Sequence, residues 1–184
     1  MSIEAFLAWE ATQVEKHFLH RGEVYAMAGA GRNHGSITPA LSRICGSALR
    51  SGTCRYRDDD TKVIVPETGS TYFPDGMIAC PPNYVSDSQG IIDNPTVIFE
   101  VLSPSTKDFD REGKFDAYGT IPSLREYVLI HSEIARVEVF TRPEGGKWTL
   151  SVYLPGTDAL IESVGIALPL SELYEEVEFA PVQE

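Results

Sequence analysis

The sequence predicts a mixed α/β (α+β) fold, in which helices pack on a mixed β-sheet core. Its 184 residues fit one domain with a substantial core. Several short apolar runs, separated by turn residues, occupy the centre of the chain and the part that follows. Stretches with helical periodicity precede these runs and interrupt them. We therefore expect one domain over residues 1–184, with its core at about 17–155.

A helix and a hairpin are expected at the N-terminus. Ser2 can cap a helix over roughly residues 3–16, where apolar residues as far along as Val14 indicate one buried face. The stretch "HFLHRGEVYAMAG" indicates two short strands that turn at Arg21 and Gly22.

A second helix is predicted next, with Asn33 as its cap and Gly52 closing it after about Arg50. Its apolar stripe consists of residues three or four apart, namely Ile37, Leu41, Ile44 and Ala48. Arg43 and Arg50 are seven residues apart and share a different face. The stripe predicts which face of this helix packs on the sheet.

The rest of the chain is predicted to be rich in strands, with one further helical segment. The expected strands contain "CRYR", "TKVIV", "TYFPDGMIAC", "TVIFEVLS", "REYVLIH", "ARVEVFTR" and "KWTLSVYLPG". A helix is expected over residues 107–118, with Ser105 or Thr106 as its cap and Gly119 as its end. Near the C-terminus, "ELY" indicates a single helical turn.

Composition and the lack of targeting signals exclude several classes of protein. With 42% hydrophobic and 23% charged residues, the composition is that of a folded chain rather than a disordered one. The N-terminus lacks a basic leader with an apolar core, and no apolar run approaches the roughly 20 residues that span a bilayer. We therefore expect a soluble, cytoplasmic protein with no membrane partner.

Three cysteines, Cys45, Cys54 and Cys80, are expected to be reduced and mostly buried, as in a cytosolic protein. They are odd in number and show no CxxC spacing, and the four histidines are scattered along the chain. A zinc site is therefore not expected.

The charge distribution has two interpretations. A net charge of −12 argues against a general nucleic-acid binder, because contacts with phosphate dominate the affinity of such proteins. However, residues 32–57 contain five arginines and no acidic residue. These arginines form either a solvated surface or a patch that faces phosphates. In the second interpretation, the residues that contact nucleic acid are Arg43, Arg50, Arg55 and Arg57.

Glu100 lies in the middle of the apolar run "TVIFEVLS", where it shares a face with Ile98 and Leu102. A carboxylate removed from water must be paired, bound to a metal or protonated. Asp75, in "YFPDGMIAC", has a similar setting, and the two carboxylates converge if their strands are neighbours. A divalent cation would relieve their repulsion, and oxygen ligands of this kind suit Mg²⁺ or Mn²⁺.

Lys114 is the nearby cation, on the helix that follows the strand of Glu100. It shares a helix face with Asp110 and Lys107, four and seven residues earlier. It can orient an attacking water and stabilise developing negative charge, or form only an exposed ion pair with Asp110. Likewise, Glu100 can form a structural salt bridge, and Asp75 can belong to a simple Pro-Asp-Gly turn. The order of the three residues along the chain favours a common site.

The stretch "YFPDGMIAC…TVIFEVLSPSTKDFDREGKFDAYGTIPSLREYVLI" resembles the Uma-two family of restriction-endonuclease-like proteins, in the PD-(D/E)xK nuclease superfamily. The resemblance extends from "SIEAFLAWE" through "RGEVYAMAG" and "RNHGSI" to "LPLSELYE". Its most specific parts are "PD", "EVLSPST", the Asp-Arg-x-x-Lys-x-x-x-Tyr spacing at residues 110–118, and "IPSLREYVLI". It implies a restriction-endonuclease-like mixed sheet flanked by helices, with an extra N-terminal helix and hairpin and C-terminal antiparallel strands.

The resemblance also implies an endonuclease that hydrolyses DNA phosphodiester bonds with the help of Mg²⁺ or Mn²⁺. We expect this endonuclease to be a homodimer. Asp75 and Glu100 would be metal ligands, with the Val101 carbonyl completing the set. Glu23, in "RGEVYAM", would orient the metal or the water from the side.

The chain departs from the superfamily pattern at one catalytic position. A lysine usually stands two residues after the second acid, but Leu102 occupies that position here. Lys114 on the following helix is therefore the candidate catalytic lysine. Asp60 and Lys62 also match the family pattern, and Lys62 is a further candidate for contact with nucleic acid. Gly76 replaces the apolar residue usual after Pro-Asp, which predicts a locally looser strand.

Two other functions compete with the nuclease. The overall acidity and Leu102 favour a catalytically weak or inactive nuclease-fold module for binding or assembly, which we expect to be a homodimer. A glycoside hydrolase with two carboxylates ranks last, because the chain shows no aromatic-rich sugar cleft and that function leaves the lysine unexplained.

Overall fold

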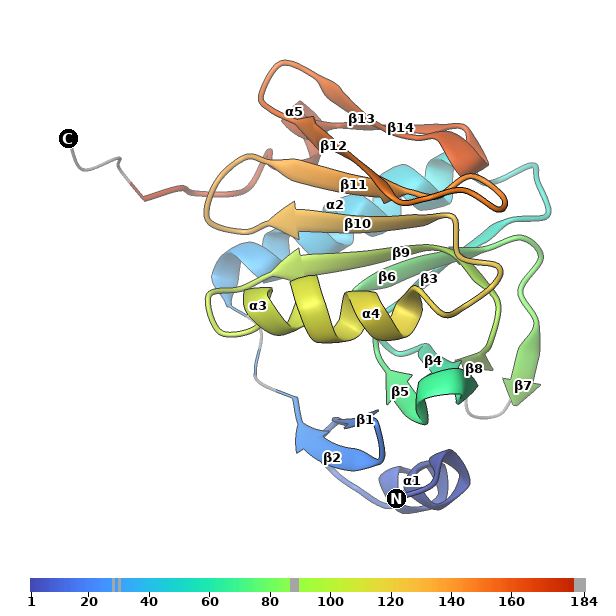
Figure 1. Ribbon diagram of the computed structural model, residues 1–184. Helices are drawn as coiled ribbons and strands as arrows, with labels where there is room; N and C mark the ends of the chain where they lie inside the picture. The colour runs from blue at the N-terminus through green and yellow to red at the C-terminus, as the bar shows by residue number, and fades with distance from the viewer. Residues whose placement is uncertain (28, 30, 87–89, 181–184) are drawn as a thin grey trace.

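The computed structural model describes residues 1–27, 29, 31–86 and 90–180, and a six-stranded mixed sheet lies at its centre (Figure 1). The strands follow the order β12-β11-β10-β9-β6-β3 across this sheet. Their bounds are β3 Arg55–Asp58, β6 Gly76–Ala79, β9 Pro95–Leu102, β10 Glu126–His131, β11 Val137–Thr141 and β12 Thr149–Tyr153. β9 and β10 are parallel, and the other neighbouring pairs are antiparallel. The predicted mixed sheet is confirmed.

A second six-stranded sheet lies beside the central one, in the order β2-β1-β5-β4-β8-β7. Its strands are β1 His17–His20, β2 Glu23–Ala26, β4 Lys62–Val65, β5 Ser70–Tyr72, β7 Tyr84–Ser86 and β8 Ile91–Ile92. β1 and β2 form the predicted hairpin, which turns at Arg21 and Gly22 with φ angles of 50° and 86°. A separate antiparallel pair, β13 Asp158–Ile161 and β14 Ile166–Pro169, agrees with the expected C-terminal antiparallel strands, although the sequence pattern did not give the bounds of these two.

Two hydrophobic cores lie on the two faces of the central sheet. On one face, helix α2 (Arg32–Ala48) packs against Val97, Phe99 and Val101 of β9. On the other face, the helical segment 107–118 packs against Ile98 and Leu102 (Figure 1). Because side chains alternate along β9, Glu100 faces the helical segment rather than α2. The sequence therefore predicted correctly which face carries Glu100.

The helical segment 107–118 is continuous but not regular. It comprises α3 (Lys107–Phe109), a π-helical turn (Asp110–Lys114) and α4 (Phe115–Tyr118), and Gly119 caps its end as predicted. Thr106 is the N-cap residue, but its hydroxyl accepts a hydrogen bond from the backbone of Ser103 instead of from the helix. The sequence did not indicate the π-helical turn.

Two predictions about the first helices are wrong. Helix α1 spans only Ile3–Glu10, because Thr12 and Gln13 side chains donate to the carbonyl of Trp9 and end it, and Val14 is fully exposed. Asn33 does not cap α2, since Gly31 occupies the cap position. Helix α2 ends at Ala48 rather than near Arg50, and Ala48 is exposed rather than part of a buried stripe. The Asn33 amide donates instead to the backbone carbonyls of Ser132 and Glu178.

The expectation of three reduced cysteines is also wrong. Cys54 and Cys80 are joined by a disulfide. The antiparallel pairing of Arg55 with Ala79 sets the two cysteines side by side at the ends of β3 and β6, which their separation of 26 residues does not reveal. Cys45 is a free and buried thiol.

The C-terminal part completes the fold around the first core. Helix α5 (Leu170–Leu173) is the predicted single turn, and it packs against α2 and β14. The predicted apolar face of β12 is present, but Leu150, Val152 and Leu154 are each at least 43% exposed. None of the helices in the described part of the chain has the length and apolar character needed to cross a bilayer.

Gly76 is required by a close contact rather than by a loose strand. A Cβ at this position would lie 2.5 Å from the hydroxyl and 3.0 Å from the ring carbons of Tyr56. We expect Gly76→Ala to lower the free energy of unfolding by about 1–3 kcal/mol, because the Tyr56 ring, which is partly buried against the first core, would have to move away from the new methyl group. Gly46→Ala on α2 is the matched control: its Cβ would meet no atom within 4 Å, so we expect about 0.5–1 kcal/mol of stabilisation in urea denaturation. Equal stabilities for the two variants would contradict this assignment.

Candidate active site

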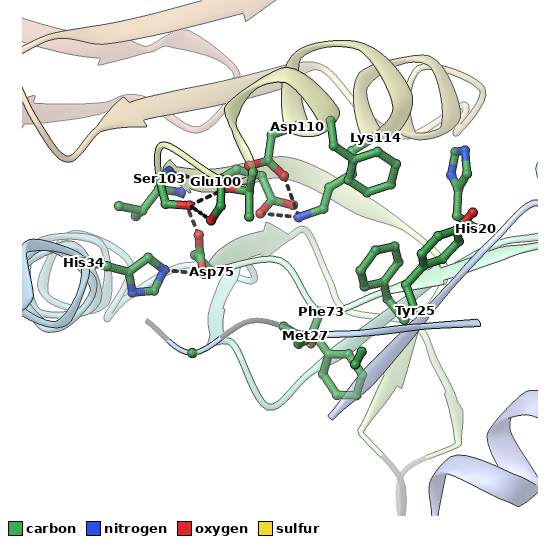
Figure 2. A pocket seen from close by; sticks show the side chains of 17 residues that line it. His20, Tyr25, Met27, His34, Phe73, Asp75, Glu100, Ser103, Asp110 and Lys114 are labelled. Carbon is green, nitrogen blue, oxygen red and sulfur yellow. Dashed lines mark hydrogen bonds and ion pairs between the residues drawn. The ribbon is translucent and has the colours of Figure 1, made fainter. Parts of the chain in front are cut away.

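A cavity of about 620 Å³ opens where β9 ends, between the central sheet, the helical segment 107–118 and the β1–β2 hairpin. Figure 2 shows charged and polar side chains on one side of it and a group of rings on the other. The polar side consists of His34, Asp75, Glu100, Ser103, Asp110 and Lys114, and the ring side of Phe18, His20, Tyr25, Phe73 and Phe109.

Glu100 is buried, and both of its oxygens are occupied. Its Oε2 lies 2.9 Å from Lys114 Nζ, and its Oε1 accepts a hydrogen bond from the Tyr118 hydroxyl at 3.2 Å. Burial raises the pKa of Glu100 well above its ordinary value, and the nearby carboxylates of Asp110 and Asp75 act in the same direction. Glu100 thus lies close to two further carboxyl groups, those of Asp110 and Asp75.

Lys114 lies between two carboxylates. Its Nζ is 2.9 Å from Glu100 Oε2 and 2.8 Å from Asp110 Oδ1. Burial alone would lower the pKa of Lys114, but Glu100 and Asp110 outweigh it and raise the pKa above its usual range. The ion pair with Asp110 is therefore present, but it is buried and shared with Glu100 rather than exposed.

Asp75 reaches Glu100 through the strand register. Gly76 of β6 pairs with Phe99 of β9, so one further step along the antiparallel register sets Asp75 opposite Glu100. Asp75 Oδ2 accepts a hydrogen bond from the Val101 N–H at 2.6 Å. The N–H and C=O of one residue in an extended strand point to the same side, so the Val101 carbonyl also faces this side of β9. The structure thus brings together Asp75, Glu100, Val101 and Lys114.

His34 is a residue of this site that the sequence analysis did not single out. It lies in the first turn of α2, and its Nε2 is 2.8 Å from Asp75 Oδ1. The hydrogen bond with Asp75 raises the pKa of His34 against the opposing effect of burial. His34 belongs to the stretch "RNHGSI" that carries part of the family resemblance, which was the signal available for finding it.

The oxygen donors of the cluster fit a hard divalent cation. Three carboxylates, of Asp75, Glu100 and Asp110, face one lysine and one histidine, so negative charge is in excess. Within the described residues, no three side chains of His, Cys, Asp or Glu are grouped so that they alone could hold a metal. A metal here would use the Val101 carbonyl and water beside two carboxylates, a set that suits Mg²⁺ or Mn²⁺.

Comparison with known proteins agrees with the fold. The sequence model of the Uma2 family, described as "Putative restriction endonuclease", matches residues 3–171. The chain belongs to this family. The match includes all four residues of the cluster, Asp75, Glu100, Val101 and Lys114.

Two relatives of this Uma2 family member come from Synechocystis sp. "Uncharacterized protein slr1290" is 32% identical over 179 residues, covering 97% of this chain and 94% of the relative. "Uncharacterized protein sll1609" is 38% identical over 160 residues, covering 85% and 89%. A crystal structure described as a "putative nuclease belonging to DUF820", from Anabaena variabilis, has a TM-score of 0.71 and 14% identity, and the match covers 92% of this chain and 97% of that one. That likeness shows a shared fold.

Glu23 does not reach the carboxylate cluster of this Uma2 family member. It is exposed on β2, where its carboxylate accepts a hydrogen bond from the Tyr25 hydroxyl at 2.7 Å. It is not among the residues that line the cavity, whereas Tyr25 is. Its implied role beside the metal has no support in its position.

The predicted basic residues also lie outside the cavity lining. Arg43 forms an ion pair with Glu172, and Arg57 donates to the Tyr84 hydroxyl. Arg50 and Arg55 line a separate surface depression, where Arg55 donates to the carbonyls of Gly52 and Cys54. Lys62 comes nearest, since its Nζ lies 4.9 Å from the ring centroid of Phe73, a cavity residue. Their contact with nucleic acid stays a prediction.

Proposed function

We propose that this protein is a metal-dependent endonuclease that hydrolyses DNA phosphodiester bonds at the cluster of Asp75, Glu100 and Lys114. The observation that supports it most is the meeting of two carboxylates from neighbouring strands with a buried lysine from the next helix. The three residues line one cavity, so a phosphate could reach all of them. The family description and that of the structural neighbour both name nucleases.

Each residue would have a separate task. Asp75, Glu100 and the Val101 carbonyl would hold Mg²⁺ or Mn²⁺, which when bound polarises a phosphoryl oxygen and lowers the pKa of its water. Lys114, held beside Glu100, would orient the attacking water and counter the negative charge that develops on the phosphorus oxygens. His34 would keep the Asp75 carboxylate in one orientation through its hydrogen bond.

The test is cleavage of plasmid, short duplex and short single-stranded DNA with MgCl₂ or MnCl₂. We expect activity that a chelator removes, and a loss of at least about 100-fold in each of Asp75→Ala, Glu100→Ala and Lys114→Ala. Asp158→Ala is the control, because Asp158 is exposed at the start of β13. Equal behaviour of the wild type and the three cluster variants would remove the proposal.

A nuclease-fold module for binding or assembly is the second candidate. Two observations favour it: each oxygen of Asp75 and Glu100 already has a partner in the protein, and Leu102 replaces the usual lysine. Calorimetric titration with Mn²⁺ separates the two functions, because a module without catalysis has no reason to bind the metal at this cluster. The homodimer and the cytoplasmic location stay predictions from the sequence.

A further inference from the structure

The wall of the cavity opposite the carboxylates is a continuous surface of rings. Phe18 and Tyr25, on β1 and β2, stack with their centroids 5.2 Å apart and their planes 13° from parallel. Phe18 also contacts Phe109 of α3, at 5.3 Å, and Phe109 meets the edge of His20 at 5.0 Å. Figure 2 shows Tyr25, His20 and Phe73 across the cavity from Glu100 and Asp75.

These rings are held in place, yet they are not closed into a core. Tyr25 is 42% exposed, and Phe18 and Phe109 are only partly buried. The Tyr25 hydroxyl donates to Glu23, and His20 Nδ1 lies 2.6 Å from the Tyr72 hydroxyl. Phe18 and Phe109 pack on one side against the second core, and the part of the group that stays exposed beside polar residues is typical of a binding surface.

Gly113 helps to hold this arrangement. A Cβ at residue 113 would lie 2.7 Å from the ring of Phe109, so the glycine allows that ring to lie against the helical segment. The same segment carries Lys114, so one ring of the wall, Phe109, and the lysine of the cluster are positioned by one helical segment.

The size and charge of the site select among nucleic-acid substrates. A cavity of about 620 Å³ is in the range of small-ligand pockets, which is about 300–1,000 Å³. A duplex keeps the faces of its bases stacked inside the helix, so only unpaired bases can stack on protein rings. The chain has a net charge of −12, and none of the residues predicted to contact nucleic acid lines the cavity, so binding inside the cavity has to depend largely on contacts other than those with phosphate.

We propose that the wall formed by Phe18, Tyr25 and Phe109 binds an unpaired nucleobase by stacking, so that the protein acts on single-stranded DNA and not on an intact duplex. This proposal rests on the proposed function. The phosphate next to the stacked nucleotide would then lie at Asp75, Glu100 and Lys114, on the opposite side of the cavity.

Binding is measured separately from cleavage. The protein carries Glu100→Gln so that the DNA stays intact, and the ligand is a short single strand containing 2-aminopurine, whose fluorescence changes on stacking. We expect the single strand to bind with fluorescence quenching, and the same strand annealed to its complement to bind at least about tenfold more weakly.

The wall is then varied at Tyr25, its most exposed residue. Tyr25→Leu keeps an apolar side chain but removes the stacking face, so we expect about tenfold weaker single-strand binding. Tyr25→Phe is the matched control: it keeps the ring, loses only the bond with Glu23, and is expected to bind within about threefold of the parent protein. Thermal unfolding of each variant checks that the fold is unchanged.

The outcomes separate this inference from the proposed function. Equal binding of duplex and single strand, or unchanged binding in Tyr25→Leu, would overturn the stacking site. Metal-dependent cleavage confined to duplex DNA, and unaffected by Tyr25→Leu, would also overturn it while leaving the nuclease in place. Ring-dependent binding of single strands without cleavage in any metal would support the stacking site and reject the nuclease.

Discussion

Replacing Lys114 with alanine is expected to lower the free energy of unfolding by about 3–5 kcal/mol, because it leaves Glu100 and Asp110 buried without their cation. The two carboxylate side chains are only 3% and 2% exposed, and Lys114 itself is 13% exposed, so water solvates the carboxylates poorly in the folded protein. Among the site residues, Lys114 is therefore the one whose removal should damage the fold most.

Urea denaturation of Lys114→Ala and Lys107→Ala provides the measurement and its control. Lys107 begins the same helical segment but is exposed, so its removal should change the free energy of unfolding by less than about 0.5 kcal/mol. A similar small change in Lys114→Ala would mean that the buried ion pairs do not hold the helix to the sheet.

The change of Glu100 to glutamine should lower activity without lowering stability substantially. The amide keeps the size of the side chain, but it removes a negative charge that is repelled by the carboxylates of Asp75 and Asp110. Lys114 would still be paired with Asp110 at 2.8 Å, and charge in the cluster would be closer to balance. We expect the free energy of unfolding to stay within about 1 kcal/mol of the wild type or to rise.

Cleavage by the same variant should fall at least about 100-fold, because an amide is a poor ligand for a divalent cation and carries no charge. Glu144→Gln, an exposed change far from β9 in the sequence, is the control for both measurements. A strong loss of stability in Glu100→Gln would show that the negative charge of Glu100 is needed to hold Lys114, and that its role is structural.

Features that depend on local patterns were predictable from the sequence. The alternation along "TVIFEVLS" indicated the face that carries Glu100, and the turn at Arg21 and Gly22 indicated the hairpin. The end of the helical segment at Gly119 followed from ordinary capping rules. The meeting of Asp75 with Glu100 depends on the register between β6 and β9, which the sequence indicated only indirectly, through the order of the site residues along the chain and the family resemblance.

Features that depend on long-range pairing were not predictable. His34 is 41 residues from Asp75, and nothing in its surroundings along the chain shows that the start of α2 points at the end of β6. The disulfide between Cys54 and Cys80 depends on which strands become neighbours. Phe18 and Tyr25 lie in a hairpin that was predicted, but its place against the helical segment 107–118 was not.

The π-helical turn that carries Lys114 gives this segment one residue more than a regular α-helix needs between the same two ends. A chain that lacks one residue between Asp110 and Lys114 could thus keep Ala117 and Tyr118 in their positions on the sheet. It would nevertheless present a different side chain to the carboxylates. In aligned relatives, a one-residue gap at this turn would mark chains that retain the scaffold and have exchanged its chemistry.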